Sequence, residues 1–476
     1  MSHPGTAREQ PSEKAPMSDN LAAPAPPPSA VDGKTSPEED ALVRKLDWRL
    51  MPMLWFMYWF NYLDRNAITV ARLDGLEKEL GLSSTQYQTC VAILFVGYIC
   101  AQIPSNMLIT RLRPSYYMAG GMALWSIISV LTAVTHDYKG MILTRFFLGI
   151  AEAPFYPGAL YLVSMFYTKD EIATRMSILF TANICGTAFA GLLAIGVFEM
   201  SGVAGISGWR WLFILFGIVS FIFAVASAWV LPDEPYNTRW LTEDERRLAV
   251  SRMETDTTEL KANTSTWRGL LDALKDVRLW VLIFMQHLHL AASGYKNFFP
   301  SIVETLGFSR NITLALTCPP YLIAGGFCII WAWSSGRYNE RVWHITVAKA
   351  IAVVGFVLAC ATLNTGARYF AMCTFATGVY ACNSIIMGWV SSTCGQNREL
   401  KSISMGIVNC IATIAAVYTP YLWPSSDAPR FVTAMATNAG FSISSAILAW
   451  VLKWMLIREN RRLSLSPNDD GRRYVY

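Results

Sequence analysis

Charge and histidine are both scarce in this sequence, and their scarcity excludes several classes of protein. Charged residues make up only 15% of the 476 residues and hydrophobic residues 53%, which is too apolar for an ordinary soluble globular protein. The five histidines are too few and too scattered for a metal site. No nucleophile–base pattern is present either, so an enzyme is the least favoured interpretation.

Cysteine is present, but without the spacing that chemistry would need. None of the ten cysteines forms a Cys-x-x-Cys pair, and all lie in or at the ends of apolar runs. They are most simply small apolar residues that pack between helices. We therefore expect no disulfide, no metal and no cofactor other than a coupling proton.

Long apolar runs fill most of the chain. Runs of about 20 residues are typical of membrane-spanning helices, and their continuous apolarity argues against a β-barrel, whose strands alternate in polarity. The sequence therefore predicts an all-α polytopic membrane protein with twelve transmembrane helices. They are expected at residues 48–70, 86–110, 116–136, 141–167, 172–199, 209–231, 279–300, 313–335, 343–363, 368–393, 402–423 and 431–456.

The polar segments between these runs predict the organisation and orientation of the chain. With the N-terminus inside, most arginines and lysines fall on the inner side, so both termini are expected to be cytoplasmic. A start signal for an amphipathic helix, Thr-x-x-Glu, occurs at Thr242–Glu245. The expected parts are a disordered cytoplasmic tail at 1–46, a six-helix bundle at 47–231, a cytoplasmic linker with the amphipathic helix at 232–278, a second six-helix bundle at 279–456 and a cytoplasmic tail at 457–476.

Four charged residues interrupt the apolar runs of the first bundle. Arg145 and Glu152 are two helical turns apart on one face, and Asp64 is followed directly by Arg65. With a rise of 1.5 Å per residue, Asp64 is expected about 12 Å deep, between Arg145 at about 6 Å and Glu152 at about 16 Å. Neighbours diverge by about 100° on a helix, so one of Asp64 and Arg65 can face a transport pathway while the other faces a partner helix.

This arrangement suits the transport of an anion together with a proton. A guanidinium group offers a planar fork for a carboxylate, and an acid in a low-dielectric environment can bind or release a proton. A carboxylate substrate and a proton can then compete for, or cooperate around, the network formed by Asp64, Arg65, Arg145 and Glu152. The alternative is that the four residues form two salt bridges that only fix helix packing.

The remaining candidates for substrate contacts are mostly uncharged polar or aromatic residues. Lys296 is expected near the outer end of its span as a substrate contact or gate, whereas Lys349 is expected to extend to an interface. Tyr62 is an aromatic candidate that contacts substrate or simply packs. The polar candidates for orienting a substrate are Asn183, Tyr321, Asn383 and Asn409.

Several motifs in order along the chain resemble one transporter family. They are "LDRNAI" (63–68), "IPSNMLITRLRPS" (103–115), "RFFLGIAEAPFYPG" (145–158), "GWRWLFILFG" (208–217) and "LPDEP" (231–235). Together they resemble the major facilitator superfamily, specifically its anion:cation symporter branch. The segments "WLTEDERRLAVSRM" (240–253) and "GVYACNSIIMGWVSS" (378–392) look most like the fungal allantoate permease group. The sequence departs from the family at Gly336, where an acid usually precedes the arginine.

The resemblance implies a major facilitator fold and proton-coupled uptake of small organic anions. In related carriers the arginine that corresponds to Arg65 holds the substrate carboxylate. The acids that correspond to Asp64 and Glu152 handle protons, with the arginine that corresponds to Arg145 as their partner. Substrate contacts map more loosely to Asn183 and Asn409.

We expect a proton-coupled symporter that works by alternating access as a monomer in the plasma membrane, with no nucleic-acid partner. An exporter of an acidic metabolite with the same fold and a nutrient sensor that binds without transporting are the alternatives.

Overall fold

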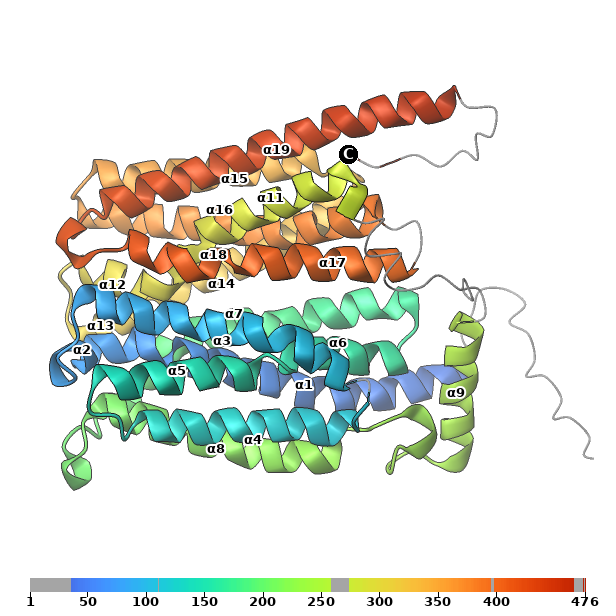
Figure 1. Cartoon of the computed structure of the whole chain (residues 1–476), viewed down its shortest axis with the longest axis horizontal. Coiled ribbons are helices and arrows are strands. Elements are labelled where there is room, and N and C mark those ends of the chain that lie inside the picture. Colours follow the sequence, from blue (N-terminus) through green and yellow to red (C-terminus); the bar gives the residue numbers. More distant parts are fainter. Residues whose placement is uncertain (1–35, 110, 258–273, 395–397, 466–473, 475) are drawn as a thin grey trace, which may run out of the picture.

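The computed structural model describes residues 36–109, 111–257, 274–394, 398–465, 474 and 476. Long helices run side by side along the longest axis of the molecule, and one short helix, α9, lies across one end of them (Figure 1). Within the described residues, eight helical segments are long and apolar enough to cross a membrane. The fold is therefore that of a polytopic helical membrane protein.

Helices coincide with every predicted span. Those of the first half of the chain are α1 (Pro37–Ala71), α2 (Leu76–Glu79), α3 (Ser84–Ile109), α4 (Pro114–Thr132), α5 (Tyr138–Glu152), α6 (Phe155–Phe166), α7 (Lys169–Phe198), α8 (Gly208–Val230) and α9 (Glu243–Thr257). Those of the second half are α11 (Val277–Ala292), α12 (Phe299–Glu304), α13 (Arg310–Leu316), α14 (Cys318–Arg337), α15 (Val342–Ala361), α16 (Thr365–Thr393), α17 (Arg398–Thr413), α18 (Ala415–Tyr418) and α19 (Val432–Ser464). A 3₁₀ turn, η4 (Ser293–Phe298), joins α11 to α12.

Proline marks breaks in several of the spans. Pro154 stands between α5 and α6, and Pro300 lies in the first turn of α12, just after η4. Because proline lacks a backbone N–H and its ring clashes with the preceding turn, a helix tends to break or restart there. The break after α5 places Glu152 at the end of its helix instead of in its middle.

Helix α1 begins ten residues earlier than the sequence composition suggested. Ser36 and Glu39 form a capping box, in which Glu39 N–H donates to Ser36 Oγ over 3.2 Å and Ser36 N–H donates to Glu39 Oε2 over 3.3 Å. Pro37 in the first turn suits this start. The prediction of a disordered tail is therefore wrong for residues 37–46, while residues 1–35 lie outside the described residues. At the other end, α19 continues to Ser464, past the predicted boundary at residue 456, and residues 466–473 lie outside the described residues.

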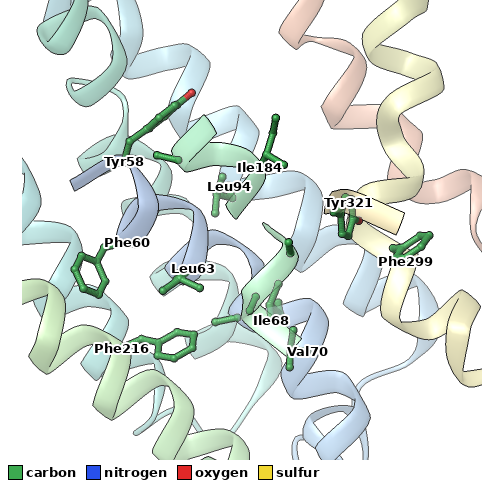
Figure 2. Close-up of a cluster of buried hydrophobic side chains, with 14 of the residues drawn as sticks. Tyr58, Phe60, Leu63, Ile68, Val70, Leu94, Ile184, Phe216, Phe299 and Tyr321 are labelled. Carbon is green, nitrogen blue, oxygen red and sulfur yellow. The ribbon is translucent and has the colours of Figure 1, made fainter. Parts of the chain in front are cut away.

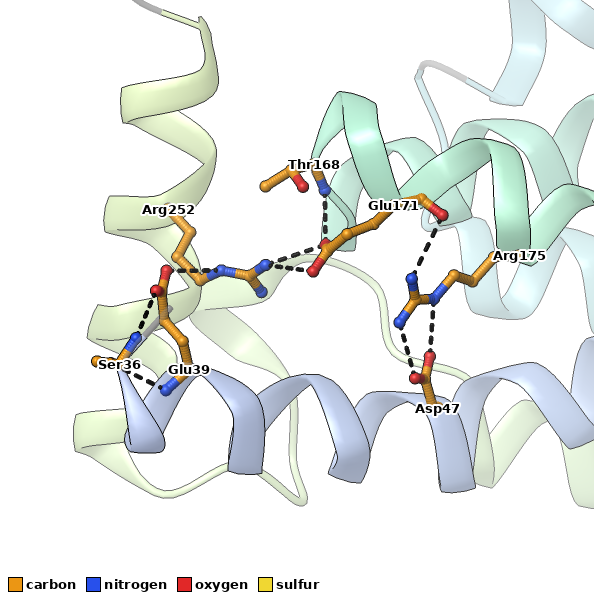
Figure 3. Close-up of polar contacts among 7 residues, drawn as sticks. All are labelled: Ser36, Glu39, Asp47, Thr168, Glu171, Arg175 and Arg252. Atoms are coloured by element: carbon orange, nitrogen blue, oxygen red, sulfur yellow. Dashed lines mark hydrogen bonds and ion pairs between the residues drawn. The ribbon is translucent and has the colours of Figure 1, made fainter. Parts of the chain in front are cut away.

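A helix, α9, forms where the linker carries the Thr-x-x-Glu signal. Thr242 and Glu245 form the expected capping box. Figure 3 shows how charged side chains fasten this helix to α1 and α7: Arg252 lies between Glu39, at 3.1 Å, and Glu171, at 2.9 Å. The Arg252 side chain is almost fully buried by these contacts. Helix α9 is thus packed against the first half of the chain.

Replacing Arg252 by glutamine should loosen α9. The substitution removes both ion pairs, and hydrogen bonds to charged groups contribute about 1.5–3 kcal/mol each. Amide hydrogen exchange in residues 243–257 should accelerate about tenfold or more, as measured by mass spectrometry. Arg247→Gln is the matched control, because Arg247 is exposed and reaches only Glu243 of the same helix at 3.8 Å. Equal exchange in the two variants would show that Arg252 does not hold α9 in place.

Glycine lets α3 and α5 touch along their backbones. A Cβ atom at Gly149 would lie 2.0 Å from the carbonyl oxygen of Leu94, and one at Gly97 would lie 2.2 Å from that of Phe146. Small residues allow such close approach in membrane helix bundles. Figure 2 shows Leu94 in the buried cluster that also contains Leu63 and Ile68 of α1. The helix that carries Glu152 is therefore pressed directly against its neighbour.

Hydrogen bonds join the two halves of the chain at the end opposite α9. Gln88 of α3 donates to the backbone carbonyl of Trp423 over 2.8 Å, and Arg72 donates to Ser301 of α12 over 3.2 Å. Arg310 at the start of α13 forms an ion pair with Asp74. This end of the molecule is consequently closed by direct contacts between the halves.

Candidate functional site

Two of the four predicted charged residues form a close ion pair. Glu152 Oε2 accepts from Arg65 Nη2 over 2.5 Å and from Arg65 Nε over 2.8 Å. Glu152 is buried, whereas the Arg65 side chain keeps 16% of its surface exposed. Glu152 Oε1 has no hydrogen-bond partner among the residues that the structure describes. One carboxylate oxygen therefore holds Arg65, and the buried Asn61 side chain also interacts with this carboxylate.

Aromatic rings surround the Arg65 guanidinium. Its carbon lies 5.2 Å from the ring centres of Tyr62 and Tyr98 and 5.9 Å from that of Phe95. The electron-rich faces of such rings attract a cation, which stabilises the guanidinium in an apolar setting. Tyr62, a predicted substrate contact, is thus next to Arg65.

Asp64 points away from this pair. It is 0% exposed, and its two carboxylate oxygens accept from Ser129 of α4 over 2.8 Å and from Ser220 of α8 over 2.9 Å. The predicted divergence of Asp64 and Arg65 is therefore confirmed. Asp64 still interacts electrostatically with both Glu152 and Arg145, so the four charges belong to one cluster.

Arg145 supplies the second positive charge of the cluster. It is 0% exposed, two turns before Glu152 on α5, and its guanidinium lies 5.2 Å from the ring centre of Phe213. None of its three guanidinium nitrogens has a hydrogen-bond partner within the described part of the chain. The structure thus brings all four predicted residues together, but it pairs Glu152 with Arg65 rather than with Arg145.

The second half of the chain contributes Lys296 and Tyr321. Lys296 Nζ lies 3.9 Å from the ring centre of Tyr380, which in turn meets Tyr321 edge to face at 5.9 Å. Figure 2 shows Tyr321 and Phe299 reaching from the second half toward α1. Lys296 and Tyr321 line a cavity of about 10 Å³ together with Asn66 of α1, Thr187 of α7 and six further residues. That volume holds about one water molecule, so the centre between the halves is nearly filled.

A much larger cavity, about 670 Å³, has none of the four charged residues of the cluster among its lining residues. Its lining is mostly apolar and includes Pro104, Gly120, Gly121 and Pro154 from α3, α4 and the turn between α5 and α6. Arg113 is the one charged residue among its lining residues, whereas the charged cluster combines two acids with two arginines.

The three predicted asparagines have different surroundings. Asn183 is buried on α7, one turn before the cavity-lining Thr187, whose hydroxyl donates to the Asn183 carbonyl. Asn383 accepts a hydrogen bond from Gln286 over 3.0 Å, which connects α16 to α11. Asn409 is half-buried on α17. Asn183 is therefore placed near the centre, whereas Asn383 takes part in the packing of the second half.

The prediction that Lys349 extends to an interface is wrong. It is 1% exposed, and its Nζ lies 3.0 Å from Nδ1 of His289. Ser129 and Ser220, which hold Asp64, were also not identified from the sequence. Neither were Asn66 and Thr187, which line the small cavity between the halves. Serine and threonine are common in membrane helices, so only a depth in the membrane similar to that of Asp64 could have identified these residues as part of the site.

The chain matches the family model described as Major Facilitator Superfamily over residues 54–420. Among curated proteins, it is 29% identical over 426 residues to the uncharacterized transporter C1683.12 of Schizosaccharomyces pombe, covering 89% of this chain and 88% of that protein. It is 29% identical over 452 residues to the major facilitator-type transporter hxnP of Emericella nidulans, covering 92% and 89%.

Solved structures share the arrangement of helices. A bacterial homologue of the human lysosomal transporter Spinster, in an inward-facing and occupied conformation, superposes with a TM-score of 0.69 at 14% identity, covering 90% of this chain and 99% of that one. A D-xylose–proton symporter superposes with a TM-score of 0.64 at 15% identity, covering 85% and 97%. At these identities the likeness shows the fold alone.

Proposed function

Since the chain belongs to the Major Facilitator Superfamily and is therefore a multi-pass secondary transporter and not an enzyme, we propose that it is a proton-coupled symporter of a small organic carboxylate anion. The single observation that carries this proposal is the Arg65–Glu152 pair. A carboxylate of the protein occupies the fork of a partly exposed arginine, at the position where a carboxylate substrate would bind.

The pair couples substrate and proton by exchange of partners. When Glu152 binds a proton, it loses its charge and its hold on Arg65. The Nε and Nη2 groups of Arg65 are then free to donate to the substrate carboxylate, which can accept with both of its oxygens. One proton and one monoanion enter together, so the net charge of the site stays unchanged.

The other predicted residues support this exchange. Asp64, held by two serines, is a second proton acceptor behind the pair, and Arg145 together with Arg65 balances the charge of the two acids. Lys296 and Tyr321 contact the substrate from the second half, across the small central cavity. Asn183, Asn383 and Asn409 are the proposed polar contacts that orient it.

Alternating access follows from the contacts between the halves. We propose that 47–231 and 279–456 act as two bundles that rock about the site, with α9 and both termini on the cytoplasmic side of the plasma membrane and one chain as the working unit. The contacts of Gln88, Arg72 and Arg310 then close the outer side. The central cavity must enlarge before a carboxylate can enter it.

The test is uptake by purified protein in proteoliposomes. Radiolabelled nicotinate, pantothenate, biotin, allantoate and simple sugar acids are offered with an inward proton gradient, with and without a protonophore. Uptake that collapses with the protonophore supports the proposal. Efflux from preloaded vesicles without uptake would make the protein an exporter, and binding without movement in either direction would make it a sensor.

Arg65→Lys should weaken uptake of the carboxylate identified by this panel by at least tenfold, mainly through a higher KM. An ammonium group keeps the charge but cannot reproduce the planar fork. Uptake is measured over a range of substrate concentrations. Arg247→Lys on the exposed face of α9 is the control and should behave as wild type. An unchanged KM in the Arg65 variant would mean that this arginine has a structural role only.

A further inference from the structure

A second group of titratable residues is buried in the second half of the chain. Lys349 of α15 and His289 of α11 are 1% and 2% exposed, and Lys349 Nζ lies 3.0 Å from His289 Nδ1. The two nitrogens are at hydrogen-bond distance, so one proton can be shared between them. The proposed exchange of partners at Arg65 and Glu152 makes no use of this pair.

Polar groups of α19 lie at the same height along the helix bundle as His289 and Lys349. Ser445 donates to the carbonyl of Met285 over 3.1 Å, and α11 and α19 run antiparallel (Figure 1). His289 is one turn beyond Met285, and Ser442 is three residues before Ser445, so both lie on the same side of this contact. Both side-chain atoms of Asn438 and the hydroxyl of Ser442 lack hydrogen-bond partners among the described residues, although both side chains are buried.

Such unpaired buried atoms are usually satisfied by internal water. The surroundings of the pair therefore contain polar atoms that can bind water, and water is the medium through which a proton reaches a buried base. A pair that only fixed helix packing would need no such neighbours.

Few other titratable groups face the pair. From α16, Cys382 acts on Lys349, and from η4 Lys296 acts electrostatically on His289. His287, two residues before His289 on α11, instead contacts the carbonyl of Ile411 on α17 and the hydroxyl of Tyr418 on α18. The Ser442 and Asn438 side chains of α19 do not titrate. The charged group that connects this region to the centre is therefore Lys296.

We propose that His289 and Lys349 form a second proton-binding site, whose occupancy responds to the charge at Lys296. The loaded pair holds one shared proton and one positive charge, and release of this proton to water leaves a neutral imidazole beside a neutral amine. An anion bound at Lys296 offsets the charge of that lysine and so favours loading. The link to transport rests on the proposed proton symport, whereas the existence of the site does not.

The test is an acid–base titration of the purified full-length protein in lipid nanodiscs, without any transport substrate. The double variant His289→Gln/Lys349→Met removes the site with side chains of similar size. Wild type should bind about one proton more than this variant between pH 9 and pH 5. Equal proton binding by wild type and the double variant would overturn the proposal.

A second measurement covers the case in which the double variant does not fold. Wild-type protein labelled with ¹⁵N-histidine is followed by NMR over the same pH range, and the conservative His289→Gln variant assigns the resonance. The ring nitrogens of His289 should shift with pH, and Lys296→Met should let the pair keep its proton in more alkaline solution. A resonance that does not respond to pH would show a fixed structural contact. These results are independent of whether any carboxylate is transported.

Discussion

Glu152→Gln should abolish concentrative uptake while leaving exchange of the carboxylate across the membrane. Glutamine keeps the size of the side chain but cannot bind and release the proton, so the gradient no longer drives transport. A pH difference of one unit corresponds to about 1.4 kcal/mol per proton, which sustains about tenfold accumulation. The accumulation ratio of the variant should fall to about one, whereas counterflow into preloaded proteoliposomes should persist.

Glu459→Gln near the end of α19 is the control for the loss of one carboxylate, and it should accumulate substrate normally. Thermal unfolding of the purified variants separates a transport defect from a folding defect. Normal accumulation by the Glu152 variant would exclude Glu152 as the proton carrier. Loss of counterflow in a variant that remains folded would mean that Glu152 takes part in binding as well.

Gly149→Ala adds one methyl group and should cause a large structural change. The new Cβ would stand 2.0 Å from the Leu94 carbonyl oxygen and 2.9 Å from the Tyr98 amide nitrogen, so backbone and not a flexible side chain has to move. Overpacking in well-packed interiors costs about 1–3 kcal/mol, and α5 can relieve it only by moving away from α3. That movement displaces Glu152, three residues along the same helix, from Arg65.

We therefore expect Gly149→Ala to lower the unfolding temperature and to reduce uptake at least tenfold. Gly120→Ala is the matched control, because no atom lies within 4 Å of a Cβ at that position. It should leave both properties unchanged. If the Gly149 variant unfolds and transports like the Gly120 variant, the close contact between α3 and α5 is not required for the site.

The spans could be predicted because a continuous apolar run of about 20 residues is rare outside membrane-spanning helices. The start of α1 could not be placed by composition, since the proline-rich residues before it dominate the average. The Ser36–Glu39 capping box that starts the helix was nonetheless present in the sequence. At this boundary the capping-box pattern predicts the start of the helix better than the average composition does.

For the site, helical rise predicted that the four charges lie close together, but not which charges pair. Pairing depends on how α1 is rotated about its axis, and that rotation is set by packing against α4, α7 and α8, which one sequence does not show. Lys349 illustrates the same limit. Its partner His289 is 60 residues away in the chain, so only the tertiary structure could reveal that this lysine faces inward.

The bond from Gln88 to Trp423 has a consequence for genetic screens of this protein. Its acceptor is a main-chain carbonyl, so no exchange of the residue at position 423 removes the acceptor itself. Random mutagenesis will therefore reveal this hydrogen bond through substitutions of Gln88 on α3, and hardly at all through substitutions in the second half of the chain. The bond itself therefore constrains the identity of the residue at position 88, whereas the Trp423 side chain is constrained by its burial and its stacking on Phe298 and not by this bond.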